Sequence, residues 1–221
     1  MIKGAIFDMD GTLLDSMYIW NHIASDYLKK HGVRPRADLD EKVSRMTLSQ
    51  AAAYIKETYV IERTEDQIVS DVNEIVADFY RYRAEPKDGI RELLAFLQKK
   101  GVRMCVATVS HPSLATAALE RCGLDAYFVR ILTCNEVGHG KDEPFLYREC
   151  QKILGTKKEE TLVFEDALHA LQTAGKDGFM TVGIFDASEP CQKEMQESAD
   201  LYLTDFRDLE RVRERFFEAD M

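Results

Sequence analysis

Short apolar runs that alternate with helical patterns constrain the fold of this chain more than any other feature of its sequence. The apolar runs cover residues 2–7, 102–107, 129–133, 161–164, 180–184 and 201–203. Helical patterns lie between them at residues 90–100, 114–122, 145–154 and 168–176. Fully apolar strands that alternate with helices are typical of a parallel sheet covered on both faces. The sequence therefore predicts an α/β fold with a doubly wound, Rossmann-like parallel sheet.

Residues 16–84 interrupt this alternation. They contain no convincing strand pattern and instead predict three helical stretches. The segment Thr47-Leu48-Ser49-Gln50 has the form of a capping box that opens the second stretch, and Thr64-Glu65-Asp66-Gln67 has the same form before the third. The predicted organisation is a first strand, an all-helical insert and then the remaining α/β units.

The charge balance excludes some classes of partner. The chain of 221 residues carries 29 Lys and Arg against 39 Asp and Glu, a formal net charge of -10, and has no run of basic residues. Such a chain is a poor candidate for binding nucleic acid or an anionic membrane surface. Its overall field also repels phosphorylated substrates. A phosphate-handling site would therefore need its own metal ion or lysine.

Cysteine usage and hydropathy indicate the cellular compartment in which the protein is expected. The five cysteines form no Cys-x-x-Cys pair, so neither a disulfide framework nor a zinc site is indicated. The N-terminal residues run straight into a strand pattern rather than a signal peptide, and no apolar stretch approaches the roughly 18 residues needed to span a bilayer. We expect a cytoplasmic protein, with a monomer as the default state.

The strongest chemical signal follows the first apolar run, in the sequence Asp8-Met9-Asp10-Gly11. Taken alone, this tetrapeptide is equally typical of an exposed turn. After a fully apolar strand, however, Asp8 and Asp10 point to the same side, because residues two apart in an extended chain share a face. Gly11 then allows a sharp turn. In an open parallel sheet, ligands bind beyond the carboxyl ends of the strands, so both aspartates are candidate site residues.

Three further motifs follow later apolar runs. They are Cys105-Val106-Ala107-Thr108, Gly140-Lys141 and Val163-Phe164-Glu165-Asp166. With the first motif, they resemble the haloacid dehalogenase superfamily, in the phosphatase and β-phosphoglucomutase-like branch that has a helical cap inserted after the first motif. The resemblance extends over essentially the whole chain. It implies a catalytic core of residues 1–14 and 87–221, with its first strand central, and a helical cap of residues 15–86.

The resemblance also implies a reaction. Asp8 would attack the phosphorus of a small phosphorylated metabolite, such as a sugar phosphate, and form an aspartyl-phosphate. This intermediate divides one difficult displacement into two easier ones. Asp10 would protonate the leaving oxygen and then activate water. The expected activity is that of a magnesium-dependent phosphatase.

The same resemblance assigns residues to the phosphoryl group. The Thr108 hydroxyl and the main-chain amides around Met9 and Asp10 would orient it, and Lys141 would balance its charge. Family members often carry Lys-Pro-x-Pro at the third motif, whereas Lys141 is followed here by Asp142-Glu143-Pro144.

The implied cofactor is Mg²⁺, which prefers oxygen ligands in octahedral geometry. Asp8, the main-chain carbonyl of Asp10 and Asp166 would hold it together with water. Glu165 either binds the ion directly or contacts the groups that bind it.

Other functions remain open. A phosphomutase would pass the phosphoryl group from Asp8 to a sugar, but that branch typically has a histidine where this chain has Trp20. A non-catalytic binding protein on the same scaffold is a third hypothesis, against which the intact Asp8, Asp10 and Asp166 argue. Dehalogenation is disfavoured because the founding dehalogenases lack the second aspartate of the first motif.

Overall fold

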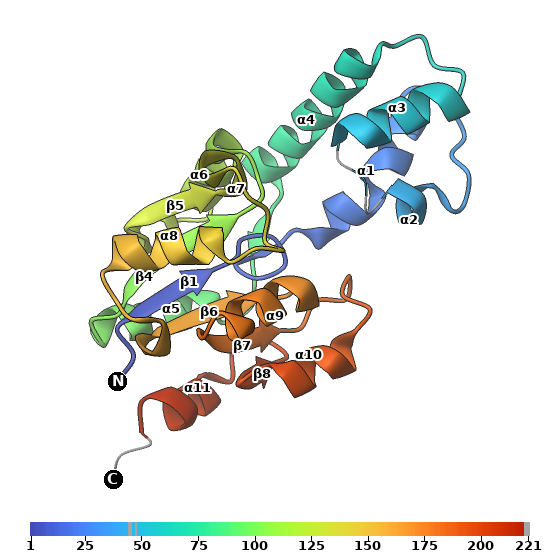
Figure 1. The fold of residues 1–221 in the computed structure, drawn as a ribbon. Coiled ribbons are helices and arrows are strands. Elements are labelled where there is room, and N and C mark those ends of the chain that lie inside the picture. The colour runs from blue at the N-terminus through green and yellow to red at the C-terminus, as the bar shows by residue number, and fades with distance from the viewer. Residues whose placement is uncertain (44–45, 47, 219–221) are drawn as a thin grey trace. The chain divides into compact units, whose positions relative to one another are not determined.

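The chain divides into two compact units in the computed structural model, which describes residues 1–43, 46 and 48–218 (Figure 1). Unit 1 consists of Met1–Asp15 and Ala84–Met221, and unit 2 consists of Ser16–Arg83. Each unit is described by itself below.

Unit 1 contains a six-stranded parallel sheet with the strand order β5-β4-β1-β6-β7-β8. Its strands are β1 (Gly4–Phe7), β4 (Arg103–Thr108), β5 (Arg130–Thr133), β6 (Thr161–Glu165), β7 (Met180–Ile184) and β8 (Leu201–Leu203). Each predicted apolar run overlaps one of these strands, and β4 and β6 each extend one residue beyond their runs. All four residues of β1 are buried, and β1 lies between β4 and β6, so its predicted central position is confirmed.

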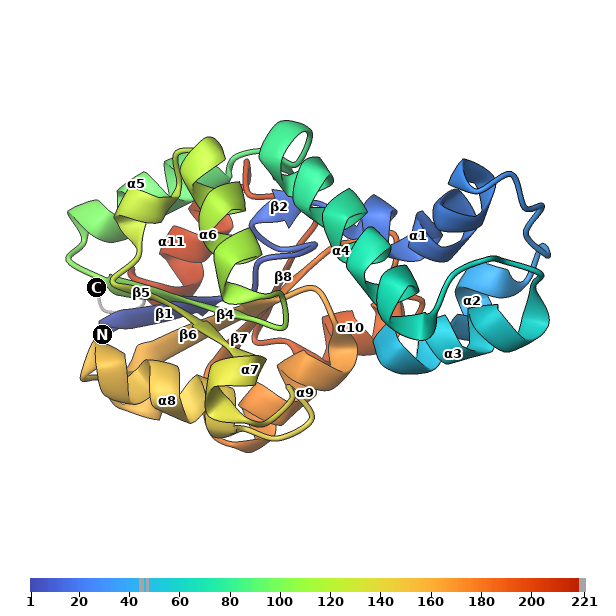
Figure 2. The same ribbon diagram turned by 90° about the horizontal axis from the view of Figure 1, so that it is seen from above.

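Helices cover both faces of this sheet, as Figure 2 shows. One face carries α5 (Ile90–Lys99), α6 (Pro112–Arg121) and α11 (Leu209–Phe216), and the other carries α8 (Phe145–Leu154) and α9 (Leu168–Lys176). Two shorter helices are α7 (Cys134–Val137) and α10 (Gln192–Ser198). Burial of Ile90, Leu93, Leu94 and Leu97 in α5 follows directly from their helical spacing. The predicted doubly wound α/β class is confirmed.

The aromatic core lies next to the first motif. Phe7, the last residue of β1, stacks on Phe164 of β6 with ring centroids 4.3 Å apart. Both rings are fully buried. Because β1 and β6 are neighbouring strands, this packing fixes the two chain segments that continue into the acidic residues of the first and fourth motifs.

Unit 2 is helical and consists of α1 (Met17–Lys30), α2 (Leu39–Val43), α3 (Leu48–Thr58) and α4 (Glu65–Tyr82). The capping box predicted at Thr64 is confirmed. The Thr64 side chain accepts a hydrogen bond from the Gln67 main-chain amide, and the Gln67 side chain accepts one from the Thr64 main-chain amide. The box predicted at Thr47 lies outside the described residues. The prediction of only three helices was wrong, because the five-residue α2, with Leu39 alone buried, is too short to show a period.

A small two-stranded antiparallel sheet marks where the chain leaves unit 1 and returns to it. It pairs β2 (Leu14–Asp15) with β3 (Glu85–Pro86). The Lys87 amide extends this pairing by donating to the Leu13 carbonyl at 2.9 Å. Among the described residues, no helix is both long enough and apolar enough to cross a membrane.

Candidate active site

The predicted motifs lie at the carboxyl edge of the parallel sheet. Asp8 follows β1, Thr108 ends β4, Glu165 ends β6 and Asp166 follows it, while Lys141 lies in the loop between α7 and α8. All five residues are buried, with Lys141 only 7% exposed. Parallel strands end at a common edge, which is why motifs distant in sequence converge here.

Lys141 joins the first and fourth motifs. Its Nζ donates a hydrogen bond to Asp8 Oδ1 and a second to Glu165 Oε1, the latter at 2.7 Å. Burial alone would lower the pKa of Lys141, but the carboxylates of Asp8 and Glu165 outweigh this effect and raise the pKa above its ordinary value. Lys141 therefore stays charged. The unusual residues that follow it do not displace it from this position.

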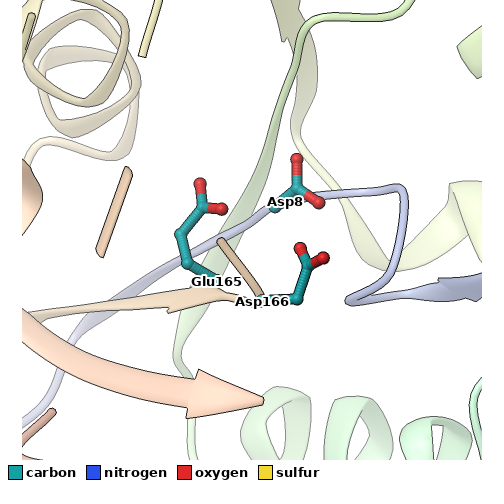
Figure 3. A group of neighbouring side chains, drawn as sticks. All are labelled: Asp8, Glu165 and Asp166. Carbon is teal, nitrogen blue, oxygen red and sulfur yellow. The ribbon is translucent and has the colours of Figure 1, made fainter. Parts of the chain in front are cut away.

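Three carboxylates gather beside Lys141. Asp8, Glu165 and Asp166 each offer an oxygen, and these oxygens lie within 4.8 Å of one another. Figure 3 shows the three side chains at the ends of β1 and β6, with the Asp166 carboxylate directed toward Asp8. If all three carboxylates were ionised, they would exceed the single ammonium group by two negative charges in a buried space. The cluster is therefore electrostatically incomplete.

Burial raises the pKa of two of these carboxyl groups, and their negative neighbours add to the effect. Burial raises the pKa of Asp8 to about 7, with Glu165 and Asp10 adding to the effect and Lys141 opposing it. Burial, with the negative charge of Asp8, also raises the pKa of Asp166 well above its ordinary value. In each case burial, together with neighbouring negative charge, disfavours the charged form of the carboxyl group.

The donor set fits a divalent cation. Glu165 Oε1 accepts hydrogen bonds from Lys141 Nζ and Tyr147 OH, both at 2.7 Å. Glu165 Oε2 is buried, and no hydrogen-bond partner for it lies within the part of the chain that the structure describes. Buried polar atoms are ordinarily paired, and hard cations bind such carboxylate oxygens. A charge of two would also balance the cluster, so Asp8, Glu165 and Asp166 could together hold a metal ion.

Asp10 and Met9 occupy a different position from this cluster. The three-carboxylate group does not include the Asp10 carboxylate, which accepts a hydrogen bond from Ser110 Oγ at 2.8 Å. The Met9 side chain is fully buried, so only its main chain can face a ligand. Its carbonyl accepts from the Leu13 and Leu14 amides, both at 2.9 Å, which closes the turn after β1.

Sequence reasoning missed three side chains that hold these residues. Thr12 Oγ1 donates to Asp166 Oδ1 at 3.1 Å, Tyr147 donates to Glu165, and Ser110 donates to Asp10. Thr12 directly follows the first motif, and Ser110 follows Thr108 at a spacing of two, so both were accessible to pattern reasoning. Tyr147 was not, because on α8 it has the spacing of an ordinary core residue.

Comparison with known proteins decides the family. The sequence model described as haloacid dehalogenase-like hydrolase matches residues 5–184, which is most of the chain. The chain belongs to this family. The predicted resemblance is confirmed, and with it the expectation of a hydrolase.

Two named phosphatases and one solved structure are similar to this chain over most of its length. Validoxylamine A 7'-phosphate phosphatase of Streptomyces hygroscopicus subsp. limoneus is 28% identical over 220 residues, covering 95% of this chain and 96% of that protein. The phosphorylated carbohydrates phosphatase of Thermotoga maritima is 24% identical over 177 residues, covering 80% and 82%. The crystal structure of β-phosphoglucomutase from Clostridium difficile has a TM-score of 0.75 at 17% identity, covering 99% and 98%. This last likeness concerns the fold alone.

Proposed function

We propose that this hydrolase is a magnesium-dependent phosphatase in which Asp8 attacks a small phosphorylated metabolite, such as a sugar phosphate. The observation that carries the proposal is the buried Lys141 ammonium bound to Asp8 beside two further acids. A carboxylate repels an anionic phosphate unless positive charge lies close to both. A fixed ammonium in a buried site supplies such charge without reorganisation during the reaction.

The proposed reaction has two steps. In the first, an Asp8 oxygen forms a bond to phosphorus while the bond from phosphorus to the substrate oxygen breaks. Asp10 gives its proton to that leaving oxygen, which departs as an alcohol. In the second, the Asp10 carboxylate takes a proton from water as the water oxygen attacks phosphorus. The bond to Asp8 breaks, and inorganic phosphate leaves.

The remaining site residues orient and balance the phosphoryl group. We assign the Thr108 hydroxyl and the main-chain amides at Met9 and Asp10 to its oxygens. Lys141 compensates negative charge on these oxygens and on Asp8. These roles place hydrogen-bond donors around a group whose transition state spreads charge over three oxygens.

We assign Mg²⁺ to the acidic cluster. Asp8, Asp166 and the main-chain carbonyl of Asp10 would hold it, with Glu165 bound directly or through water. Bound Mg²⁺ would supply two positive charges to the cluster and would help to neutralise charge on the phosphoryl oxygens. The excess of carboxylates and the buried Glu165 Oε2, which has no hydrogen-bond partner among the described residues, support this assignment.

The proposed class of substrate is supported by the relatives rather than by the geometry of the site. Two relatives bear the names of phosphatases for phosphorylated compounds, and one name specifies carbohydrates. We also propose that unit 1 is the catalytic core, because every motif residue lies in it, and that the helical unit 2 is the cap that selects the substrate. A shared scaffold alone does not specify the molecule, so the substrate must come from experiment.

Phosphate release from a panel of phosphorylated metabolites tests the proposal. Wild type, Asp8→Asn and the control Asp125→Asn, which changes an exposed aspartate, are compared in Mg²⁺ and in EDTA. We expect release by wild type and the control that requires Mg²⁺ and is absent in Asp8→Asn. Product analysis distinguishes hydrolysis from transfer to a second sugar position. Release that persists in Asp8→Asn would contradict the proposal.

A further inference from the structure

A hydrogen bond outside the four motifs ties the end of β4 to the proposed acid and base. Ser110 is 5% exposed and Asp10 is 8% exposed. Ser110 Oγ donates to Asp10 Oδ2 at 2.8 Å, across 100 positions of sequence. The two residues leave neighbouring parallel strands, β4 and β1, so the sheet itself sets their separation.

Ser110 is fixed from its other side as well. Its main-chain N–H donates to Thr108 Oγ1 at 3.0 Å. A hydroxyl that accepts from the amide two residues later forms a local turn and holds both residues. The bond uses a lone pair of the Thr108 oxygen, so its hydrogen can still be donated to a phosphoryl oxygen. Ser110 therefore connects the residue proposed to orient the phosphoryl group with the residue proposed to move the proton.

We propose that Ser110 is a positioning residue for Asp10, an inference that rests on the proposed phosphatase function. Its hydroxyl holds one oxygen of the Asp10 carboxylate and so fixes the rotation of the carboxylate about its own axis. The second oxygen then exchanges the proton with the leaving oxygen and with water. Such placement matters because a displacement of about 1 Å in a reacting group can lower the rate about 10²-fold.

The chemistry of the leaving group separates this role from a structural one. An alkoxide is a poor leaving group and requires the proton of Asp10, whereas 4-nitrophenolate is a stable anion that departs without it. The ratio kcat/KM covers the steps from substrate binding through transfer to Asp8, and it leaves out the later hydrolysis in which Asp10 acts as the base. A misplaced Asp10 lowers kcat/KM selectively for alkyl phosphates. General damage to the site would lower it equally for both kinds of substrate.

The experiment compares kcat/KM for 4-nitrophenyl phosphate and for the best sugar phosphate of the panel. The variants are Ser110→Ala, Ser110→Thr, which keeps the hydroxyl, and Ser113→Ala as a control at an exposed serine. We expect Ser110→Ala to lower kcat/KM for the sugar phosphate about 10- to 100-fold and for 4-nitrophenyl phosphate far less. Ser110→Thr should recover most of the loss, and Ser113→Ala should match wild type.

A second comparison tests whether Ser110 acts through Asp10. In an Asp10→Asn background, Ser110→Ala should cause no further selective loss, because the proton that it positions is absent. Equal losses for the two substrates, or a selective loss that adds to that of Asp10→Asn, would overturn the inference. A fully active wild type with an unaffected Ser110→Ala variant would overturn the inference alone. A wild type that releases no phosphate from any compound would instead overturn the proposed function, and this inference with it.

Discussion

Replacement of Lys141 by methionine tests the electrostatic account of the site in the metal-free protein. Lys141 is 7% exposed, and its ammonium group bonds to two carboxylates that are also buried. Methionine keeps much of the side-chain volume and removes the charge. Asp8 and Glu165 then remain buried and lose their shared ammonium partner. The variant therefore isolates the effect of charge from that of packing.

The expected loss is large. Removing one partner of a buried, hydrogen-bonded ion pair typically costs about 3–5 kcal/mol, because the remaining charge is left uncompensated. With a urea dependence of about 2 kcal/mol per molar, this corresponds to a midpoint lowered by roughly 2 M. Lys152→Met is the matched control, since the Lys152 side chain is 67% exposed and pairs with Glu149 three residues away. Exposed pairs of this kind contribute about 0–1 kcal/mol.

Urea denaturation in EDTA, monitored by circular dichroism, measures the stability of both variants. Lys141→Met should unfold at a clearly lower urea concentration than Lys152→Met and wild type. Its rate of phosphate release, measured separately with Mg²⁺, should fall about 10²–10³-fold, as on removal of a group that stabilises transition-state charge. If the two variants lost the same stability, the buried ion pair would not have the energetic role assigned to it.

Three further changes have defined expectations. Tyr147→Phe removes the hydroxyl that donates to Glu165, and should raise the Mg²⁺ concentration for half-maximal activity about 10-fold or more. Thr64→Ala should lower the free energy of unfolding by about 1 kcal/mol, because the first turn of α4 loses its capping acceptor. The hydrogen bond from Arg148 is the main cause that holds the pKa of Asp177 below its ordinary value. This contact therefore stabilises the fold above a pH of about 4, and the stabilisation decreases as the pH falls below that value. Asp177→Asn should therefore destabilise the protein at pH 7, with the difference from wild type shrinking as the pH falls.

Each of these expectations has a control or a contrary result. Metal titration of Tyr147→Phe that matches wild type would show that the hydroxyl does not influence the metal site. Thr64→Ser keeps the capping oxygen and should unfold like wild type in urea. For Asp177→Asn, urea midpoints at several pH values are compared with those of wild type. A difference that grew on acidification would contradict the sign derived from the lowered pKa.

The fold was predictable where burial leaves a simple pattern in the sequence, such as a continuous apolar run or a helix bounded by proline and glycine. All six strands of the parallel sheet coincide with short apolar runs, because strands covered on both faces need apolar residues throughout. Helix α8 begins after Pro144 and ends at Gly155, which adopts the left-handed conformation with φ 67°. The short α2 was missed because five residues do not complete two helical turns.

The residues at the site were predictable where they follow a strand or lie in an ordered motif. The structure brings Asp8, Glu165 and Asp166 together with Lys141, although they come from three segments that lie far apart in the sequence. Tyr147 could not be found in this way, since its hydroxyl reaches Glu165 only through the packing of α8 against the sheet. Hydrogen-bond partners depend on tertiary distances that a period in the sequence does not encode.

A phosphoryl group on Asp8 is the central claim, and it can be observed directly. Wild type and Asp8→Asn are mixed with the best substrate and Mg²⁺, quenched in acid during turnover and digested for peptide mass spectrometry. The account predicts a phosphorylated peptide that contains Asp8 in wild type, which hydroxylamine removes, and none in Asp8→Asn. Phosphate release by wild type with no modification of Asp8, or with the phosphoryl group on another residue, would contradict it.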